Sequence, residues 1–175
     1  MRLILILWAA LAGAAAVAGA AAAAEQVDIP QPDAPLRGIL FRPQGDGPFP
    51  GVVALHGCES LVNRTGKMSP HFADWGERLV AAGLAVIFPD SFGSRGLRTQ
   101  CRVQERKVRS EHERVADANA ARRWLQSQPW TIKERISVVG WANGGAASLW
   151  AVRPPARRAR LERPHPHPDP DRNSR

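Results

Sequence analysis

The chain has 175 residues, with 24 Lys and Arg against 16 Asp and Glu, which gives a formal net charge of +8. Hydrophobic residues make up 44% of it, a share that excludes general disorder and, at this length, favours one globular domain over two. Residues 151–175 hold seven Arg and three acidic residues, so half of the net charge lies in this terminal segment. A basic face for nucleic acid on the folded domain is therefore not expected.

Residues 1–24 predict a signal peptide, whose removal leaves a mature chain that begins at Glu25. Arg2 is followed by an uncharged apolar run, and residues 22–24 are the small alanines that a signal peptidase requires. The alternative is an uncleaved N-terminal membrane anchor, since a charge-free stretch of this length can span a bilayer. Cleavage is favoured because the second half of the run is Ala and Gly, which are weakly hydrophobic. We therefore expect export to the periplasm or to the exterior.

The chain has two cysteines, Cys58 and Cys101. In an oxidising compartment they can form a disulfide, which would close a long loop and stabilise the fold by a few kcal/mol. The alternative is a pair of buried free thiols. The sequence leaves both open and favours the disulfide.

Continuous apolar runs predict three strands that are buried on both faces, at residues 51–55, 84–88 and 136–139. Residues 39–43 predict an earlier strand at the edge of the sheet, because Pro43 cannot donate a hydrogen bond to a neighbouring strand.

The segments between these runs predict helices. We expect one helix with Ser69 at its N-cap, Pro70 at its first position and Gly83 just after its end. Residues 104–128 predict a second, strongly charged helix. Its apolar stripe would consist of Val108, Val115, Ala118 and Leu125, and Glu105 and Arg109 would pair on its solvent side.

This alternation predicts an α/β domain over residues 25–150, with a mostly parallel sheet flanked by helices. After Trp150 the patterned sequence stops, and residues 151–175 predict a disordered Arg/Pro-rich tail. A solvated tail is favoured over one that binds nucleic acid or anionic lipid, because no aromatic residues interleave its arginines. We interpret the abrupt change as a shifted or interrupted reading frame.

The strand at residues 136–139 runs directly into the sequence GWANGG at residues 140–145. A strand, a turn with flanking glycines and a following helix form the context of a nucleophile elbow, in which Gly140 and Gly144 relieve crowding. Cys58 follows the buried strand 51–55 in the sequence HGC. The loop at residues 56–58 and Asn143, which follows the elbow centre, can therefore each offer a backbone N–H to an oxyanion hole.

Three stretches of the sequence, FRPQGDGPFPGVVALHGC, LAVIFPDSFGSRG and RISVVGWANGG, resemble the dienelactone hydrolase family of α/β-hydrolases over roughly residues 35–150. The resemblance implies hydrolysis of small esters or lactones by a Ser or Cys nucleophile at the elbow, with an Asp and a His from later loops. It also implies no metal and no organic cofactor, and no nucleic-acid partner.

The sequence departs from the family's pattern in two ways. The elbow centre is Ala142, which has no group that can attack a carbonyl carbon. No recognisable strand with an acid or a base follows residue 150, since His165, His167, Asp169 and Asp171 lie in a Pro-rich stretch. We therefore expect a partial α/β-hydrolase fold that lacks the C-terminal strands and is catalytically incompetent. Removal of the nucleophile alone lowers kcat on the order of 10⁶-fold in a comparable hydrolase.

Substitute catalytic groups are weak candidates. Cys58 is expected in the oxyanion loop, Ser91 is a turn residue that could face the pocket mouth, and His71 and His112 are expected to be solvated on helices. The functional alternative is a non-catalytic module that binds small carboxylates or lactones. The strand at residues 136–139 would also be left as an apolar sheet edge through which the chain could self-associate.

Overall fold

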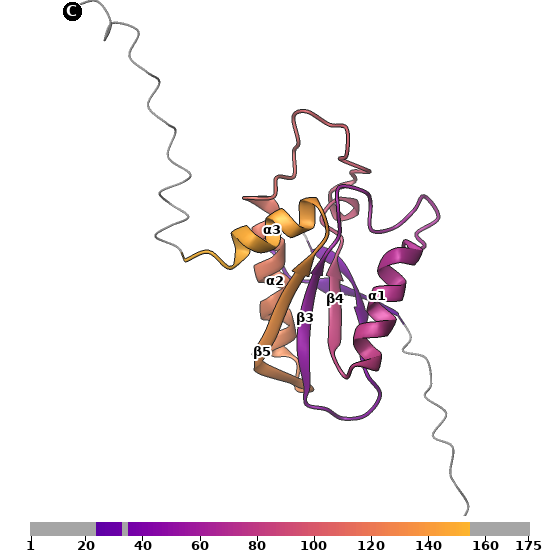
Figure 1. Cartoon of the computed structure of the whole chain (residues 1–175), viewed down its shortest axis with the longest axis vertical. Helices are drawn as coiled ribbons and strands as arrows, with labels where there is room; N and C mark the ends of the chain where they lie inside the picture. The colour runs from indigo at the N-terminus through magenta and orange to yellow at the C-terminus, as the bar shows by residue number, and fades with distance from the viewer. Residues whose placement is uncertain (1–23, 33–34, 155–175) are drawn as a thin grey trace, which may run out of the picture.

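In the computed structural model, which describes residues 24–32 and 35–154, five strands form one sheet in the order β1-β2-β4-β3-β5 (Figure 1). The strands are β1 (Glu25–Ile29), β2 (Leu36–Phe41), β3 (Phe49–Leu55), β4 (Ala85–Pro89) and β5 (Thr131–Gly140). Strand β3 runs parallel to both β4 and β5, whereas β2 is antiparallel to both β1 and β4. The mostly parallel sheet that the sequence predicts is confirmed.

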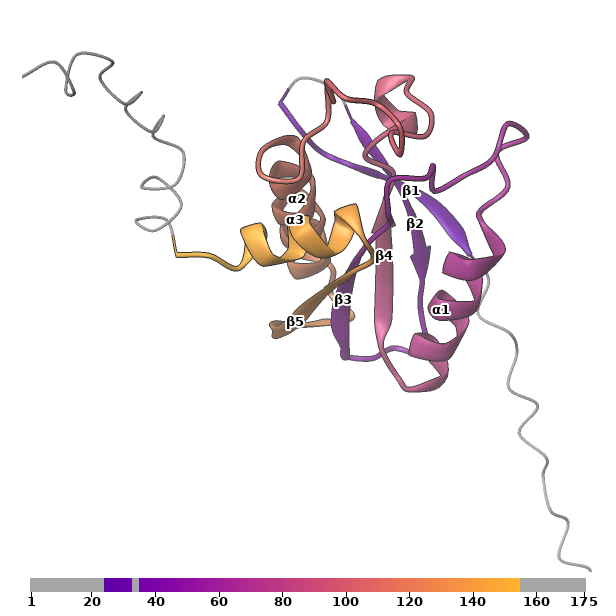
Figure 2. The same cartoon turned by 45° about the horizontal axis from the view of Figure 1, so that its top comes forward.

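Helices cover both faces of the sheet (Figures 1 and 2). They are α1 (Pro70–Ala81), α2 (Glu113–Ser127) and α3 (Asn143–Ala151), and a single 3₁₀ turn, η1, spans Gly93–Arg95. Alternate side chains of β3 divide between two cores: Val53 and Leu55 pack with α2 and α3, whereas Val52 and Ala54 pack with α1. Because β3 is buried on both faces, its sequence is continuously apolar rather than alternating.

The predicted position of the second strand was wrong. Residues 39–43 were expected at the sheet edge, but β2 ends at Phe41, before Pro43, and lies between β1 and β4. Strand β1 covers the outer side of β2, with Val27 opposite Gly38. The sequence of β1 did not predict a strand because four of its five residues are exposed or only half-buried, so no continuous apolar run marks it.

The helix predicted over residues 104–128 is shorter than expected. Helix α2 begins at Glu113, and residues 104–112 form turns. Arg109 therefore pairs with Glu113, at 3.4 Å, and not with Glu105. The expected apolar stripe is buried, as its members Val108, Val115, Ala118 and Leu125 are each at most 4% exposed. Helix α1 begins at Pro70 as predicted, and Ser69 is its N-cap.

The predicted signal peptide lies outside the described residues except for Ala24, and most of the predicted tail at residues 151–175 lies outside them as well. Ala151 is the last residue of α3, so the helix continues one residue past the predicted domain end at residue 150. In the part of the chain that the structure describes, no helix has the length and apolar character needed to cross a membrane.

Strand β5 has one neighbour in the described sheet, β3, so its other side is a sheet edge (Figure 1). Residues 136–140 of β5 pair in register with residues 51–55 of β3, and this pairing places Gly140 beside Leu55. The carboxyl ends of the two strands therefore meet at the same end of the sheet, where the chain turns into the two segments of the candidate site.

Candidate active site

The turn between β5 and α3 has the strained backbone that a nucleophile elbow requires. Ala142, its central residue, has φ 48° and ψ −113° and caps the start of α3. Among the described residues, Ala142 is the one non-glycine residue with positive φ. L-residues rarely adopt this conformation, and residues strained in this way cluster at active sites and ligand-binding turns. The residue is exposed, so a longer side chain at position 142 would be accessible to solvent.

Two glycines allow the turn to form. A Cβ atom on Gly140 would lie 2.3 Å from the carbonyl oxygen of Gly144. A Cβ atom on Gly144 would lie 2.1 Å from the carbonyl oxygen of Leu55, which belongs to the neighbouring strand. These contacts are far shorter than any allowed approach, so both positions must be glycine for α3 to start this close to β3. The predicted elbow glycines therefore have a structural explanation.

The predicted oxyanion loop lies beside the elbow. It follows β3, and the Trp141 N–H, in the elbow, donates a hydrogen bond to the Leu55 carbonyl oxygen at 3.1 Å. The backbone N–H groups of Cys58 and Asn143 have no hydrogen-bond acceptor within residues 24–32 and 35–154. Two free N–H donors next to an elbow are the elements from which an oxyanion hole is built.

Cys58 and Cys101 are joined by a disulfide across a sequence separation of 43 residues. The bond ties the oxyanion loop to the loop that precedes α2, and the Gln100 N–H strengthens this tie by donating to the Cys58 carbonyl oxygen at 2.7 Å. A disulfide sulfur is not a nucleophile, so Cys58 cannot act as a substitute nucleophile while the bond is intact. The Glu59 carboxylate lies within 4.8 Å of both sulfurs, yet bonded sulfurs do not serve as thiolate metal ligands.

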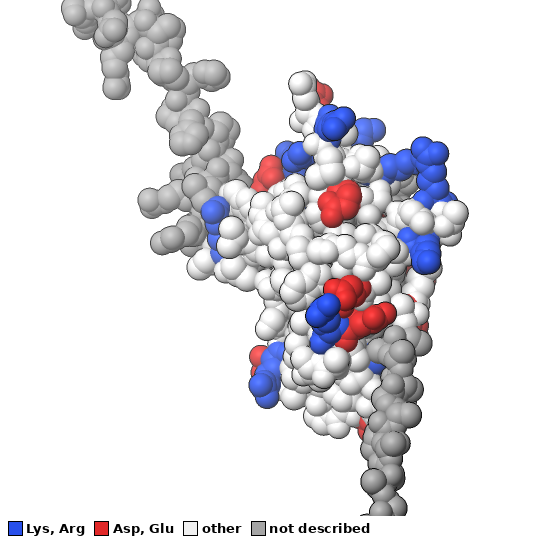
Figure 3. Space-filling view, turned by 45° about the vertical axis from the view of Figure 1, so that its right-hand side comes forward, with Lys and Arg blue, Asp and Glu red and all other residues white. Residues whose placement is uncertain are grey.

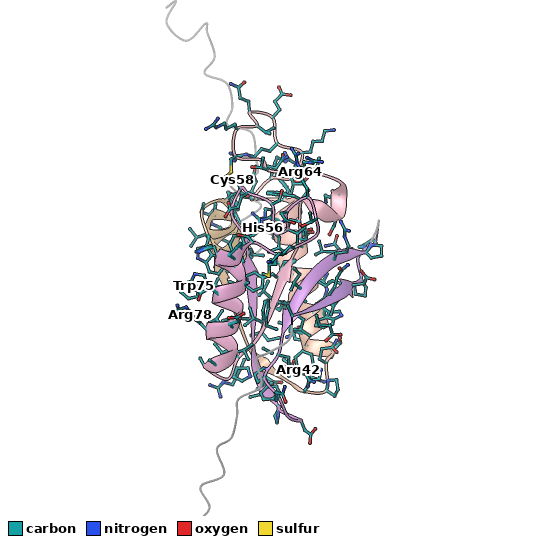
Figure 4. The ribbon with its side chains drawn as sticks, turned by 90° about the vertical axis from the view of Figure 1, so that its right-hand side faces the viewer. Arg42, His56, Cys58, Arg64, Trp75 and Arg78 are labelled. Carbon is teal, nitrogen blue, oxygen red and sulfur yellow. A yellow bond between two sulfur atoms is a disulfide. The ribbon has the colours of Figure 1, made fainter. Side chains whose placement is uncertain are left out.

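His56 is buried below the oxyanion loop, with 0% of its surface exposed, at the same end of the sheet as Cys58 (Figure 4). Its Nδ1 lies 3.0 Å from the carbonyl oxygens of Gly57 and Glu59, and because both are acceptors, Nδ1 carries the proton. Burial, and secondly the charge of Arg114, lower the pKa of His56 to about 3. His56 is therefore neutral at pH 7, and it supports the loop rather than serving as a base.

The turn after β4 does not supply a nucleophile. Ser91 was considered as a residue at the pocket mouth, but it is 0% exposed, and its hydroxyl has no partner in the described part of the chain. Asp90 beside it accepts a hydrogen bond from the Gly93 N–H at 2.9 Å, and burial raises the pKa of this carboxyl group. These residues shape the turn and are turned away from solvent.

Trp141 packs against other aromatic rings. Its indole stacks on the Phe88 ring, with centroids 6.3 Å apart and planes 16° from parallel. It also meets the rings of Phe72, Trp75 and His71 edge-on or tilted, so the elbow rests on an aromatic cluster against α1. His71 and His112 are exposed, as predicted, although His112 is the N-cap of α2 and not an interior helix residue.

A hollow of about 870 Å³ lies next to the site, between the loops that follow β3 and β4. Its lining includes the basic side chains of Arg64, Lys67 and Arg98, but neither Ala142 nor Asn143. Lys and Arg side chains gather at this end of the molecule (Figure 3). Arg64 lies at the same end as Cys58, whereas Arg42 lies at the opposite end (Figure 4). The elbow residues therefore do not line this hollow.

Sequence reasoning missed two residues that contact the elbow, Ser110 and Arg114. The side chain of Asn143 donates to Ser110 Oγ at 2.6 Å, and its Oδ1 accepts a hydrogen bond from Arg114 Nη1 at 2.8 Å. Both residues lie in a segment whose charge pattern resembles that of a solvated helix, so no local signal marked them.

Comparisons with solved structures show which proteins have a similar fold. The chain is similar to a dienelactone hydrolase-like promiscuous phosphotriesterase from metagenomic libraries (21% identity, TM-score 0.62), covering 75% of this chain and 54% of that one. It is similar to a dienelactone hydrolase from Anabaena variabilis (23% identity, TM-score 0.55, 75% and 57% covered) and to dipeptidyl peptidase 4 from Porphyromonas gingivalis (18%, 0.57, 76% and 19%). At these identities the likeness shows the fold alone.

The chain spans about half the length of the first two of these structures. The described sheet and helices α1, α2 and α3 therefore form a partial α/β-hydrolase fold, as predicted. A search of curated protein sequences gives no significant match. The family model described as "Dienelactone hydrolase family" matches residues 36–161, which is well over half of the chain. On this match, and with the elbow and oxyanion loop in the order and geometry described, the chain belongs to the dienelactone hydrolase family.

Proposed function

We propose that this chain is an ester- or lactone-hydrolase domain by descent that is catalytically incompetent as its sequence stands. One observation carries the proposal: the strained elbow position, at φ 48°, holds Ala142, whose methyl group cannot attack a carbonyl carbon. Loss of the nucleophile alone lowers kcat on the order of 10⁶-fold in a comparable hydrolase. The substitutes considered are a disulfide-bonded Cys58 and a fully buried Ser91, which supports the same conclusion.

The test is direct. The purified chain is incubated with a fluorophosphonate serine-hydrolase probe and, separately, with p-nitrophenyl acetate. We expect no labelled residue and no turnover above that of the heat-denatured chain, in which no folded site remains. Turnover that is present in the wild type and disappears in a folded Ser91→Ala variant would show that Ser91 is the nucleophile and would refute incompetence.

A second candidate is a non-catalytic module that binds small carboxylates or lactones. The free backbone N–H groups of Cys58 and Asn143 favour it, because each could donate a hydrogen bond to a carboxylate or carbonyl oxygen. We expect phenylacetate and γ-butyrolactone, added separately to ¹⁵N-labelled protein, to shift the amide signals of these two residues saturably. Amides of β1, on the far edge of the sheet, serve as the internal control. Shifts that are uniform or do not saturate would exclude the module.

Export through a cleaved signal peptide is also part of the proposal. The Cys58–Cys101 disulfide supports it, because disulfides persist in oxidising compartments. N-terminal sequencing of the protein from the periplasmic or secreted fraction should start at Glu25. A membrane-bound product that retains Met1 would instead identify the N-terminal segment as an anchor.

We further propose that the chain self-associates through β5, whose outer edge has no neighbour in the described sheet. Ser137 is exposed on this strand, and Lys on an edge strand opposes pairing with another chain. Sedimentation velocity should show concentration-dependent dimers that Ser137→Lys removes and that Ser127→Lys, at the exposed end of α2, retains. Identical behaviour of the two variants would exclude β5 as the interface.

A further inference from the structure

Arg114, in the first turn of α2, is a charged residue with none of its surface exposed. A buried charge is costly unless polar groups surround it. Its Nη1 donates to the Gly57 carbonyl oxygen at 3.3 Å and to Asn143 Oδ1 at 2.8 Å, and its guanidinium carbon lies 5.2 Å from the centroid of the Phe92 ring. One nitrogen atom therefore joins the oxyanion loop to the elbow helix.

The contact with Gly57 sets the direction of the Cys58 N–H. Both groups belong to one peptide unit, and in a trans peptide the C=O and N–H bonds point in opposite directions. Arg114 Nη1 and His56 Nδ1 hold the Gly57 carbonyl oxygen toward the protein interior. The Cys58 N–H consequently points away from the buried guanidinium, and it has no acceptor among the described residues.

The second donor, the Asn143 N–H, is held in place by Ser110 and Arg114. The Asn143 side chain bonds to Arg114 through Oδ1 and to Ser110 through Nδ2, while Ser110 Oγ donates to the Asn143 carbonyl oxygen at 3.3 Å. These contacts fix the first residue of α3 on both its side chain and its backbone. The Asn143 N–H, which points back from the start of the helix, is fixed with them.

We propose that Arg114 is a positioning residue that aligns the Cys58 and Asn143 N–H groups as one anion-binding pair and places its own charge behind them. This inference rests on the anion site of the proposed function and adds the group that organises it. Burial lowers the pKa of Arg114 to about 10, so the guanidinium keeps its charge at pH 7. A carboxylate should therefore depend on Arg114 more strongly than a neutral lactone does, because only the carboxylate has a net charge to attract.

The experiment compares Arg114→Met and Arg114→Lys with Arg122→Met, a matched control because Arg122 is exposed on the same helix. In the free proteins, the ¹³C′ signal of Gly57 and the amide signals of Cys58 and Asn143 are recorded. Relative to the wild type, we expect the chemical shifts of all three signals to change in Arg114→Met, to change less in Arg114→Lys, and to be unchanged in Arg122→Met. Phenylacetate affinity should fall about tenfold in Arg114→Met, which is the effect of losing one hydrogen bond from a misaligned backbone N–H to the carboxylate. The affinity for γ-butyrolactone should fall less.

The outcomes are separable. If the three signals stay in place in a folded Arg114→Met protein, the positioning role is wrong, whatever the protein binds. If they move but the wild-type chain binds neither phenylacetate nor γ-butyrolactone, the binding module fails while the positioning role stands. If Arg114→Met does not fold, Arg114→Lys decides: signals identical to those of the wild type overturn the inference, and displaced signals support it.

Discussion

The Trp141 N–H donates a hydrogen bond to the Leu55 carbonyl oxygen at 3.1 Å, and this bond extends the pairing of β5 with β3 past the last paired residues. The elbow therefore cannot move relative to the oxyanion loop without breaking the end of the sheet. This link explains why the strained turn can form around Ala142: it is maintained by sheet pairing and glycine packing, neither of which needs a nucleophile.

The backbone at residue 142 should be a measurable source of strain. A non-glycine residue in such a conformation costs roughly 1–3 kcal/mol, whereas glycine adopts it freely at a smaller entropic cost. We expect Ala142→Gly to raise the free energy of unfolding by about 1 kcal/mol in urea denaturation. Ala146→Gly, at an exposed position inside α3, should lower it by about 1 kcal/mol. Equal losses in both variants would contradict the assignment of strain to residue 142.

Gly144 should not tolerate a side chain. A Cβ atom there would lie 2.1 Å from the Leu55 carbonyl oxygen and 2.5 Å from that of His56, and both are backbone atoms that cannot rotate away. We expect Gly144→Ala to lower the free energy of unfolding by about 3 kcal/mol or more. In Gly145→Ala, the nearest atom would be 3.2 Å away, so its stability should stay within about 1 kcal/mol of the wild type. A mild effect at residue 144 would mean that α3 can move away from β3.

The buried His56 should make the protein sensitive to mild acid. Its pKa is about 3 in the folded protein and 6.5 when unfolded, so between these values the unfolded chain binds a proton that the folded chain excludes. The contribution of His56 to stability is complete above pH 6.5 and declines as the pH falls through this window, by up to about 1.4 kcal/mol per pH unit.

Urea denaturation of the wild type and of His56→Gln at pH 7, 6 and 5 measures this slope. We expect the slope to flatten in His56→Gln, because the amide does not titrate. The slope should persist in His71→Gln, since His71 is exposed on α1. Parallel pH profiles for all three proteins would assign the acid sensitivity to other groups.

The disulfide should stabilise the folded chain by restricting the unfolded one. For a loop closed over 43 residues, the chain-entropy model gives about 4 kcal/mol. We expect the double variant Cys58→Ser/Cys101→Ser to lose about this much in urea denaturation, and the native protein to release no thiol to Ellman's reagent unless it is first reduced. One reactive thiol per cysteine in the untreated protein would show that the bond does not form.

Features encoded by neighbouring residues were predictable. The buried strand β3, the start of α1 at Pro70 and the glycines of the elbow follow from apolar runs and from residues with restricted backbone preferences. The edge position of residues 39–43 was wrong because β1, which covers β2, presents mostly exposed side chains and depends on pairing with residues seven to fifteen positions further along the chain. The start of α2 was misplaced because charged residues 104–112 fit a helix as well as a solvated loop.

The sequence by itself determined the family, the order of the strands and helices that follow β1, and the absence of a nucleophile at residue 142, because each of these depends on which residues are adjacent along the chain. Only the tertiary structure decided that Arg114 is buried and that one of its nitrogens reaches both Gly57 and Asn143. These three residues come from α2, the oxyanion loop and α3, and packing of these segments at one end of the sheet brings them together. A charged residue in a charged segment shows no local sign of burial, since its environment is created by parts of the chain far away in sequence.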